Sequence, residues 1–283
     1  MSVTTPYPSE IPPGVELILD VSYGSVKGVP LLLDLARPRE RASAKLPAIV
    51  YMHGGAWQSG SKADGVPAIC YYAAHGFVAA SVGYRLSSQA QFPAQIEDCR
   101  CAVRFLRAMA DEYGIAPARI GAMGASSGGH LAILLGLTGG GTEFADKGGW
   151  ENFSSGVSAI CDLFGVSDFF EMPRRHLPDV VNATSKFLGG SIDLVPERYI
   201  AANPIRHVHS AAPPFLIVHG DRDDLVPLRQ SELLHAALKA AGVNATLYVV
   251  KGASHGSIEV VTPEVRSIIL AFFEKHLKAV QLD

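Results

Sequence analysis

The chain has 283 residues, of which 48% are hydrophobic and 18% charged, and its net charge is −3. This composition is typical of a globular protein and argues against long disordered regions. The near balance of acidic and basic residues gives no electrostatic reason to expect nucleic acid or an anionic membrane as a partner. No apolar run approaches the roughly 18 residues of a transmembrane helix, so we expect no stable membrane insertion.

Strand and helix patterns alternate along most of the chain. A predicted hairpin comes first, with strands at Val15–Tyr23 and Pro30–Ala36. Six further strand-like runs follow, at Pro47–Met52, Phe77–Val82, Arg119–Met123, Val157–Cys161, Pro214–His219 and Ala245–Val250. Helical patterns lie at Gly65–His75, Pro93–Tyr113, Ser127–Leu137, Leu228–Ala241 and Pro263–Lys278. This alternation predicts an α/β fold, a mostly parallel sheet with helices on both faces and an antiparallel N-terminal edge.

Residues 162–210 interrupt the alternation. The segment is rich in phenylalanine and carries four prolines, and it separates two predicted core strands. We interpret it as a small helical lid over one end of the sheet, inserted within a single domain of residues 1–283. A plain surface insertion is the alternative.

The four cysteines are too few for a disulfide scaffold, and we expect reduced thiols. The first ten residues lack the basic and apolar regions of a signal peptide, so we expect a cytoplasmic protein. Secretion with a removed signal and a homo-oligomeric state both stay open. The pair His207 and His209 has no matching carboxylate or cysteine cluster, so we expect no metal.

The segment Gly124-Ala-Ser126-Ser-Gly128 matches the pattern G-x-S-x-G between a predicted strand and a predicted helix. A sharp strand–turn–helix lifts a serine hydroxyl above the sheet edge, and small flanking residues avoid clashes in the strained turn. We therefore predict that Ser126 is a nucleophile. The same glycines also resemble a dinucleotide-binding loop, but such a loop should follow the first strand of the fold.

A second glycine-containing loop, His53-Gly-Gly-Ala-Trp57, directly follows the predicted strand that ends at Met52. Backbone N–H groups fixed in advance stabilise the oxyanion that forms during acyl transfer. We assign the donors to Gly55 and Ala56, together with the N–H of Ser127. A register shifted by one residue, with Gly54 as a donor, stays open. We expect Trp57 to lie near the substrate-binding pocket.

Two later loops supply an acid and a base. His219-Gly-Asp-Arg-Asp-Asp follows one predicted strand, and we choose Asp223 as the acid, with Asp221 bracing the turn and Asp224 facing solvent or the lid. His255 follows the next strand and is the predicted base. The chain order Ser126, Asp223, His255 is the order expected for a nucleophile, acid and base in this architecture. Histidine can take the serine proton, and a carboxylate fixes its tautomer.

These motifs, together with Tyr84-Arg-Leu86, Phe92-Pro-Ala-Gln-Ile-Glu-Asp98 and Gly252-Ala-Ser-His255, resemble those of α/β-hydrolase carboxylesterases. The similarity is to hormone-sensitive-lipase-like esterases and to the bifunctional deacetylase–feruloyl esterase type. It implies an eight-stranded sheet, a small lid and ester hydrolysis without a cofactor. Ala56 stands where many relatives have a third glycine, which favours the deacetylase–feruloyl and arylformamidase-like branches.

The leading hypothesis is a serine carboxylesterase that cleaves short-chain or aryl esters of small molecules through an acyl-enzyme intermediate. An arylformamidase that cleaves an N-formyl amide is the second hypothesis, because H-G-G-x-W is compatible with it. A non-catalytic ligand-binding member of the fold ranks last, because all three triad residue types are present.

Overall fold

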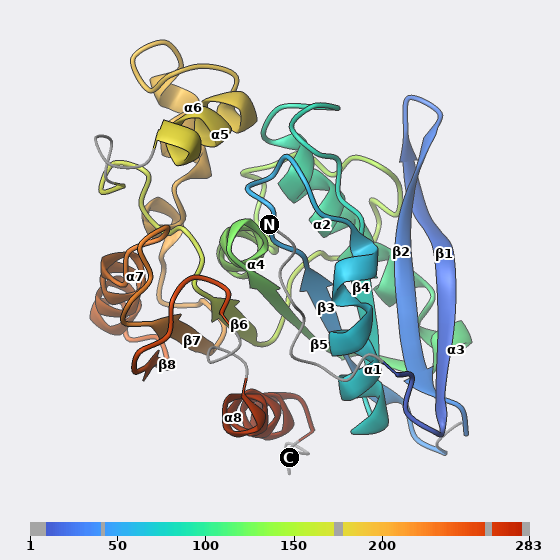
Figure 1. The fold of residues 1–283 in the computed structure, drawn as a ribbon. Coiled ribbons are helices and arrows are strands. Elements are labelled where there is room, and N and C mark those ends of the chain that lie inside the picture. The colour runs from blue at the N-terminus through green and yellow to red at the C-terminus, as the bar shows by residue number, and fades with distance from the viewer. Residues whose placement is uncertain (1–9, 41–42, 173–177, 258–261, 279–283) are drawn as a thin grey trace.

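The protein is described here by a computed structural model, which covers residues 10–40, 43–172, 178–257 and 262–278 (Figure 1). Eight strands form one sheet in the order β1-β2-β4-β3-β5-β6-β7-β8. The strands are β1 (Val15–Val26), β2 (Val29–Pro38), β3 (Leu46–Met52), β4 (Val78–Val82), β5 (Ile115–Ala125), β6 (Ile160–Leu163), β7 (Phe215–Gly220) and β8 (Ala245–Val250). β1–β2 and β2–β4 pair antiparallel, and the remaining pairs are parallel.

The helices cover both faces of this sheet. They are α1 (Val66–Ala74), α2 (Ala94–Ala108), α3 (Ala110–Tyr113), α4 (Ser127–Thr138), α5 (Pro178–Leu188), α6 (Pro196–Ala202), α7 (Arg229–Ala240) and α8 (Pro263–Phe273). Short 3₁₀ helices occur at η1 (Lys62–Gly65) and η2 (Pro204–His207), and the short π-helix η4 (Glu274–Lys278) extends α8. The expected α/β-hydrolase architecture, with its antiparallel N-terminal edge, is confirmed.

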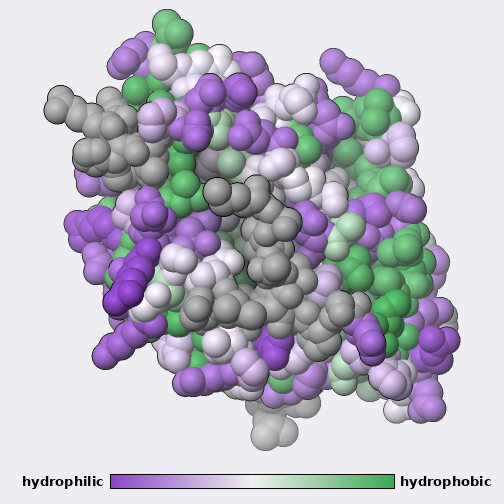
Figure 2. All heavy atoms as spheres, viewed as in Figure 1, coloured by the Kyte–Doolittle hydropathy of each residue, from purple (hydrophilic) through white to green (hydrophobic). Residues whose placement is uncertain are grey.

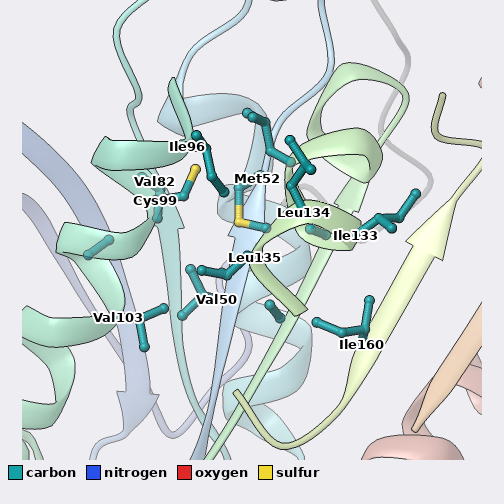
Figure 3. Packing of buried hydrophobic residues seen from close by; sticks show 14 of the residues in the cluster. Val50, Met52, Val82, Ile96, Cys99, Val103, Ile133, Leu134, Leu135 and Ile160 are labelled. Atoms are coloured by element: carbon teal, nitrogen blue, oxygen red, sulfur yellow. The ribbon is translucent and has the colours of Figure 1, made fainter. Parts of the chain in front are cut away.

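Two hydrophobic clusters hold the layers together. On one face, buried residues of α2, α4 and α7 pack on the sheet. Figure 3 shows Met52 of β3 between Ile96 of α2 and Leu134 of α4. On the other face, α1 and α8 bury their apolar sides against the same sheet. Strands covered on both faces are nearly continuous apolar runs, because neither side of the sheet meets water.

Several predicted boundaries differ from the structure. The helix expected over Pro93–Tyr113 is interrupted at Met109, where φ is −95° and ψ is 21°, before the short α3. The strand expected at Val157–Cys161 is displaced to Ile160–Leu163, the stretch in register with both β5 and β7. The first two residues of the 162–210 segment therefore belong to the sheet, and α5, α6 and η2 lie in the rest.

The β1 edge of the sheet carries exposed apolar side chains. Leu19 is 57% and Val29 is 58% exposed, and Figure 2 shows hydrophobic residues along the side of the molecule where β1 and β2 lie. No helix in the described parts of the chain is long and apolar enough to cross a membrane.

Candidate active site

Ser126 lies in the turn between the end of β5 and the start of α4. Its φ of 55° and ψ of −118° are sparsely populated by residues with a side chain, so the turn is strained. A Cβ atom on Gly124 would collide with the carbonyl oxygen of Gly128, and one on Gly128 would collide with that of Met52. Both flanking glycines are therefore required by close backbone contacts, as the motif predicts.

The structure brings Ser126, His255 and Asp223 into one hydrogen-bonded line. Nε2 of His255 lies 2.9 Å from Oγ of Ser126, and Nδ1 of the same ring lies 2.7 Å from Oδ2 of Asp223. The rings of Phe164 and His255 make an edge-to-face contact, with centroids 4.9 Å apart and an angle of 71° between the ring planes. The imidazole is therefore held by hydrogen bonds at both nitrogens and by an aromatic contact.

The three aspartates of the acid loop are in different environments. Asp223 is 9% exposed and accepts hydrogen bonds at Oδ1 from the N–H groups of Leu225 and Val226, at 3.0 and 2.8 Å. Asp221 accepts the N–H of Gly252 at 2.6 Å, and Asp224 is exposed. Only Asp223 reaches the imidazole, so the geometry favours the choice made from the sequence.

The buried ring of His219 also contacts the Asp223 carboxylate. Its Nε2 lies 3.2 Å from Oδ2 of Asp223 and 2.7 Å from the carbonyl oxygen of Val226, while Nδ1 lies 2.7 Å from the hydroxyl of Ser231. Burial alone would raise the pKa of Asp223, but hydrogen bonds from His219 and His255 outweigh it and lower that pKa to about 2. The carboxylate is therefore ionised at neutral pH.

The loop after β3 lies directly against the nucleophile turn. A Cβ atom on Gly54 would be 3.1 Å from the carbonyl oxygen of Ala125. The loop then turns sharply, since Gly55, Ala56 and Trp57 have φ values of 116°, 51° and 59°. The assignment of oxyanion donors to Gly55, Ala56 and Ser127 remains a prediction.

Tyr84, to which the sequence motifs assign no role, holds this loop. The hydroxyl of Tyr84 donates to the carbonyl oxygen of His53 at 2.8 Å, and the two rings stack with centroids 4.3 Å apart. Burial lowers the pKa of His53 despite its contact with the Gly54 carbonyl, which favours the neutral, stacked ring.

Trp57 packs into the protein instead of facing an open pocket. Its side chain is 3% exposed and stacks on Phe187 of α5, with centroids 4.4 Å apart at 9°. Its Nε1–H donates to Nδ1 of His130 at 3.3 Å, and Nε2 of that ring lies 2.8 Å from the carbonyl oxygen of Ala202. Burial lowers the pKa of His130 to about 4, so the ring is neutral and can accept one bond and donate the other. In this conformation little of Trp57 is available to substrate, and its substrate contact stays a prediction.

A cleft of about 670 Å³ lies beside the loop that carries Trp57. The N–H of Ser87 donates to the carbonyl oxygen of Trp57 at 2.7 Å, which ties the cleft wall to this loop. Eight residues line the cleft: Gln58, Ser87, Ser88, Gln91, Ser185, Lys186, Gly189 and Gly190. Sequence reasoning missed this cleft, because its walls come from three separate segments. Among the described residues, no group of three or more histidine, cysteine, aspartate or glutamate side chains could hold a metal ion.

Comparison with known proteins gives relatives that are named esterases. Esterase LipC of Mycobacterium tuberculosis is 31% identical over 228 residues, which are 80% of this chain and 56% of LipC. The chain thus spans little more than half the length of that relative. Esterase LipQ of the same organism is 30% identical over 259 residues, with 89% of this chain and 59% of LipQ covered.

Solved structures agree with this result. A truncated carbohydrate esterase from gut microbiota superposes with a TM-score of 0.81 at 28% identity, and the match covers 96% of this chain and all of that one. The BD-FAE family model matches residues 33–238 of this chain, which include the strained serine turn, the loop after β3 and the acid loop. This protein is therefore a member of the BD-FAE family, with the α/β-hydrolase fold.

Proposed function

We propose that the protein is a serine carboxylesterase in which Ser126, His255 and Asp223 carry the reaction. The observation that carries this proposal is the unbroken line of hydrogen bonds from the Ser126 hydroxyl through the imidazole to the buried carboxylate. A serine hydroxyl is a poor nucleophile until a base takes its proton, and the geometry supplies that base. The named esterase relatives support the same activity.

The chemistry follows in two halves. Asp223 accepts the Nδ1–H of His255, so that Nε2 is free to take the Ser126 proton while Oγ attacks the ester carbonyl carbon. Backbone N–H groups of the loop after β3 and of Ser127 stabilise the oxyanion. The imidazolium then protonates the leaving alkoxide, and the acyl-enzyme remains. His255 then takes a proton from a water molecule, whose oxygen attacks the acyl carbon. As the bond from the acyl carbon to Oγ breaks, the imidazolium returns that proton to Oγ, which releases the carboxylic acid and restores Ser126.

The substrate we propose is an ester with a short acyl group and a polar alcohol part. Esterase 2 of Thermogutta terrifontis has been solved with propionate bound, in a structure 29% identical to this chain, and with butyrate bound, in one 28% identical. Both support a short acyl group. The residues that line the cleft beside Trp57 include Gln58, Ser87 and Lys186, whose side chains could hydrogen-bond to an alcohol part that carries hydroxyls. The carbohydrate esterase among the structural relatives supports this choice.

We also propose that helices α5 and α6 of the 162–210 segment act as a lid. The stacking of Phe187 on Trp57 joins this segment to the loop of the oxyanion donors, and the N–H of Phe92 donates to the carbonyl oxygen of Phe187 at 2.9 Å. The position of α5 therefore bears directly on the loop that receives the substrate carbonyl.

The test compares purified wild type with Ser126→Ala on a panel of acetyl, butyryl and octanoyl esters with alkyl, aryl and sugar alcohols. We expect wild-type turnover to fall with acyl length, and Ser126→Ala to lose at least about 10⁴-fold in kcat with unchanged folding. Retained turnover in a folded Ser126→Ala variant would exclude this nucleophile. Turnover of N-formylkynurenine far above that of every ester would favour an arylformamidase instead.

A further inference from the structure

One buried carboxyl group near the site has no part in the reaction described above. Asp162 is the third residue of β6 and is fully buried. Its Oδ1 accepts the N–H of Gly165 at 2.9 Å, and its Oδ2 has no hydrogen-bond partner among the described residues. A buried polar atom left without a partner costs free energy, so a residue of this kind calls for an explanation.

The carboxyl group occupies a socket made by two glycines. A Cβ atom on Gly129, in the first turn of α4, would lie 2.5 Å from Oδ1 of Asp162, and a Cβ atom on Gly165 would lie equally close. The side chain therefore wedges between the helix that begins at the nucleophile and the turn that follows β6. Neither glycine could be replaced without moving the carboxyl group or the turn.

The turn braced by Asp162 contacts two members of the proposed triad. The carbonyl oxygen of Leu163 accepts the N–H of Ser126 at 2.9 Å. The next residue, Phe164, has a φ of 45° and packs edge-on against the His255 ring. A left-handed conformation at a bulky residue is strained, so it persists only where surrounding contacts impose it. The hydrogen bond from the Gly165 N–H to Asp162 fixes the backbone immediately after Phe164 and is one such contact.

We propose that Asp162 is a positioning residue, which holds the turn of residues 162–165 so that Ser126 and His255 stay aligned. This inference rests on the proposed function, because it assigns Asp162 to the geometry of that triad. The carboxyl group acts as an acceptor for Gly165 and not as a proton carrier. Burial raises the pKa of Asp162 to about 7, although the charge of His219 and the Gly165 N–H oppose the rise, so a neutral form is accessible near neutral pH.

Two substitutions separate the acceptor from the shape of the side chain. Asp162→Asn keeps an oxygen for Gly165 and places a donor where a neutral carboxyl group would have one. Asp162→Leu keeps the branched shape but has no acceptor. Cys161→Ala is the matched control, because Cys161 is the adjacent residue of β6, is buried, and packs in the cluster on the opposite face of the sheet.

The experiment measures kcat and KM for one short-chain ester, together with the rate of labelling of Ser126 by a fluorophosphonate and the midpoint of urea unfolding. We expect Asp162→Leu to lower kcat and the labelling rate by about 10- to 100-fold with KM within about 3-fold, as a misplacement near 1 Å does. Asp162→Asn should recover both rates to within about 3-fold of wild type. Cys161→Ala should be less stable, with both rates within about 2-fold.

Two results would overturn the inference: a folded Asp162→Leu variant as fast as wild type, or an Asp162→Asn variant as slow as Asp162→Leu. Should Asp162→Leu not fold, Phe164→Leu tests the same turn at its contact with His255, and an unchanged kcat in that variant would equally overturn the inference. Failure of the proposed function is distinguished by the wild type itself, which would then show neither turnover nor a label on Ser126.

Discussion

The strain at Ser126 predicts that glycine is more stable than alanine at residue 126, whereas alanine is more stable than glycine at residue 127. At residue 126, φ is 55° and ψ is −118°, a conformation that glycine adopts readily and alanine does not. At residue 127, which begins α4, the backbone is helical and alanine is favoured. We therefore expect Ser126→Gly to be more stable than Ser126→Ala, and Ser127→Gly to be less stable than Ser127→Ala.

The magnitudes follow from the two opposing effects. A non-glycine residue in such a sparsely populated conformation costs about 1–3 kcal/mol. Glycine avoids this cost, but it loses more backbone entropy on folding than alanine does, which offsets about 0.5–1 kcal/mol of the advantage. The net advantage of Ser126→Gly over Ser126→Ala is therefore about 1 kcal/mol, or about 2–4 °C in Tm. In the helix, Ser127→Gly should be about 1 kcal/mol less stable than Ser127→Ala.

The assay is urea unfolding of the four variants, followed by tryptophan fluorescence, with thermal unfolding as a second measurement. Both Ser126 variants lose the hydroxyl group and its hydrogen bond to His255, so the loss of this bond cancels when the two variants are compared. The reasoning is refuted if glycine is less stable than alanine at both positions by the same amount, because the turn would then carry no strain that glycine relieves.

Three further predictions concern individual side chains. Asp223→Asn should lower kcat by about 10⁴-fold, because the imidazole tautomer is lost, whereas Asp221→Asn and Asp224→Asn should cost less than 10-fold; equal losses in steady-state assays would mean that another carboxylate is the acid. The pKa of Asp162 is raised from 3.8 to about 7, so the unfolded chain ionises first and wild type loses stability as pH rises between these values. At about 1.4 kcal/mol per pKa unit, the stability of Asp162→Asn relative to wild type should increase by about 3 kcal/mol between pH 4 and 7, and urea titrations with no such increase would contradict the raised pKa. Trp57→Ala should lower the free energy of unfolding by about 3–5 kcal/mol, because a ring that is 3% exposed leaves a cavity, and a change below 1 kcal/mol would show that the ring is not packed as described.

The fold could be predicted because its determinants are local. Apolar runs of strand length alternate with amphipathic helical patterns, and a parallel sheet covered on both faces is the arrangement that buries them. The position of β6 at Ile160–Leu163 could not be predicted from the local sequence pattern. Its register is set by hydrogen bonds to β5 and β7, which are distant in sequence.

That Ser126, Asp223 and His255 lie together could be predicted, because each follows a predicted strand in a recognisable motif, and the carboxyl ends of parallel strands meet at one edge of the sheet. Their catalytic role stays a proposal. Trp57 shows where this reasoning stops. The loop sequence indicates a position near the site, but the stacking partner Phe187 lies 130 positions further along the chain, on a helix of the inserted segment. Which face of a tryptophan is covered depends on how that segment packs, and no local pattern records it.

Asp162 was missed for a related reason. A single aspartate at the end of an apolar strand resembles an ordinary boundary residue, and only the packing against Gly129 and Gly165 shows that it is enclosed. The glycines at 129 and 165 are the only trace of this socket in the sequence, and they become interpretable once the helix α4 and the turn after β6 are seen together.

The most direct test of Ser126 as the activated nucleophile is the mass of the covalent adduct formed with a fluorophosphonate. We expect one adduct per chain, on the peptide that contains Ser126, and no adduct in Ser126→Ala. Labelling should be slowed at least 100-fold in His255→Ala, because the serine then lacks its base. An adduct on a different residue, or labelling of wild type and His255→Ala at the same rate, would contradict the claim that this serine is activated by this imidazole.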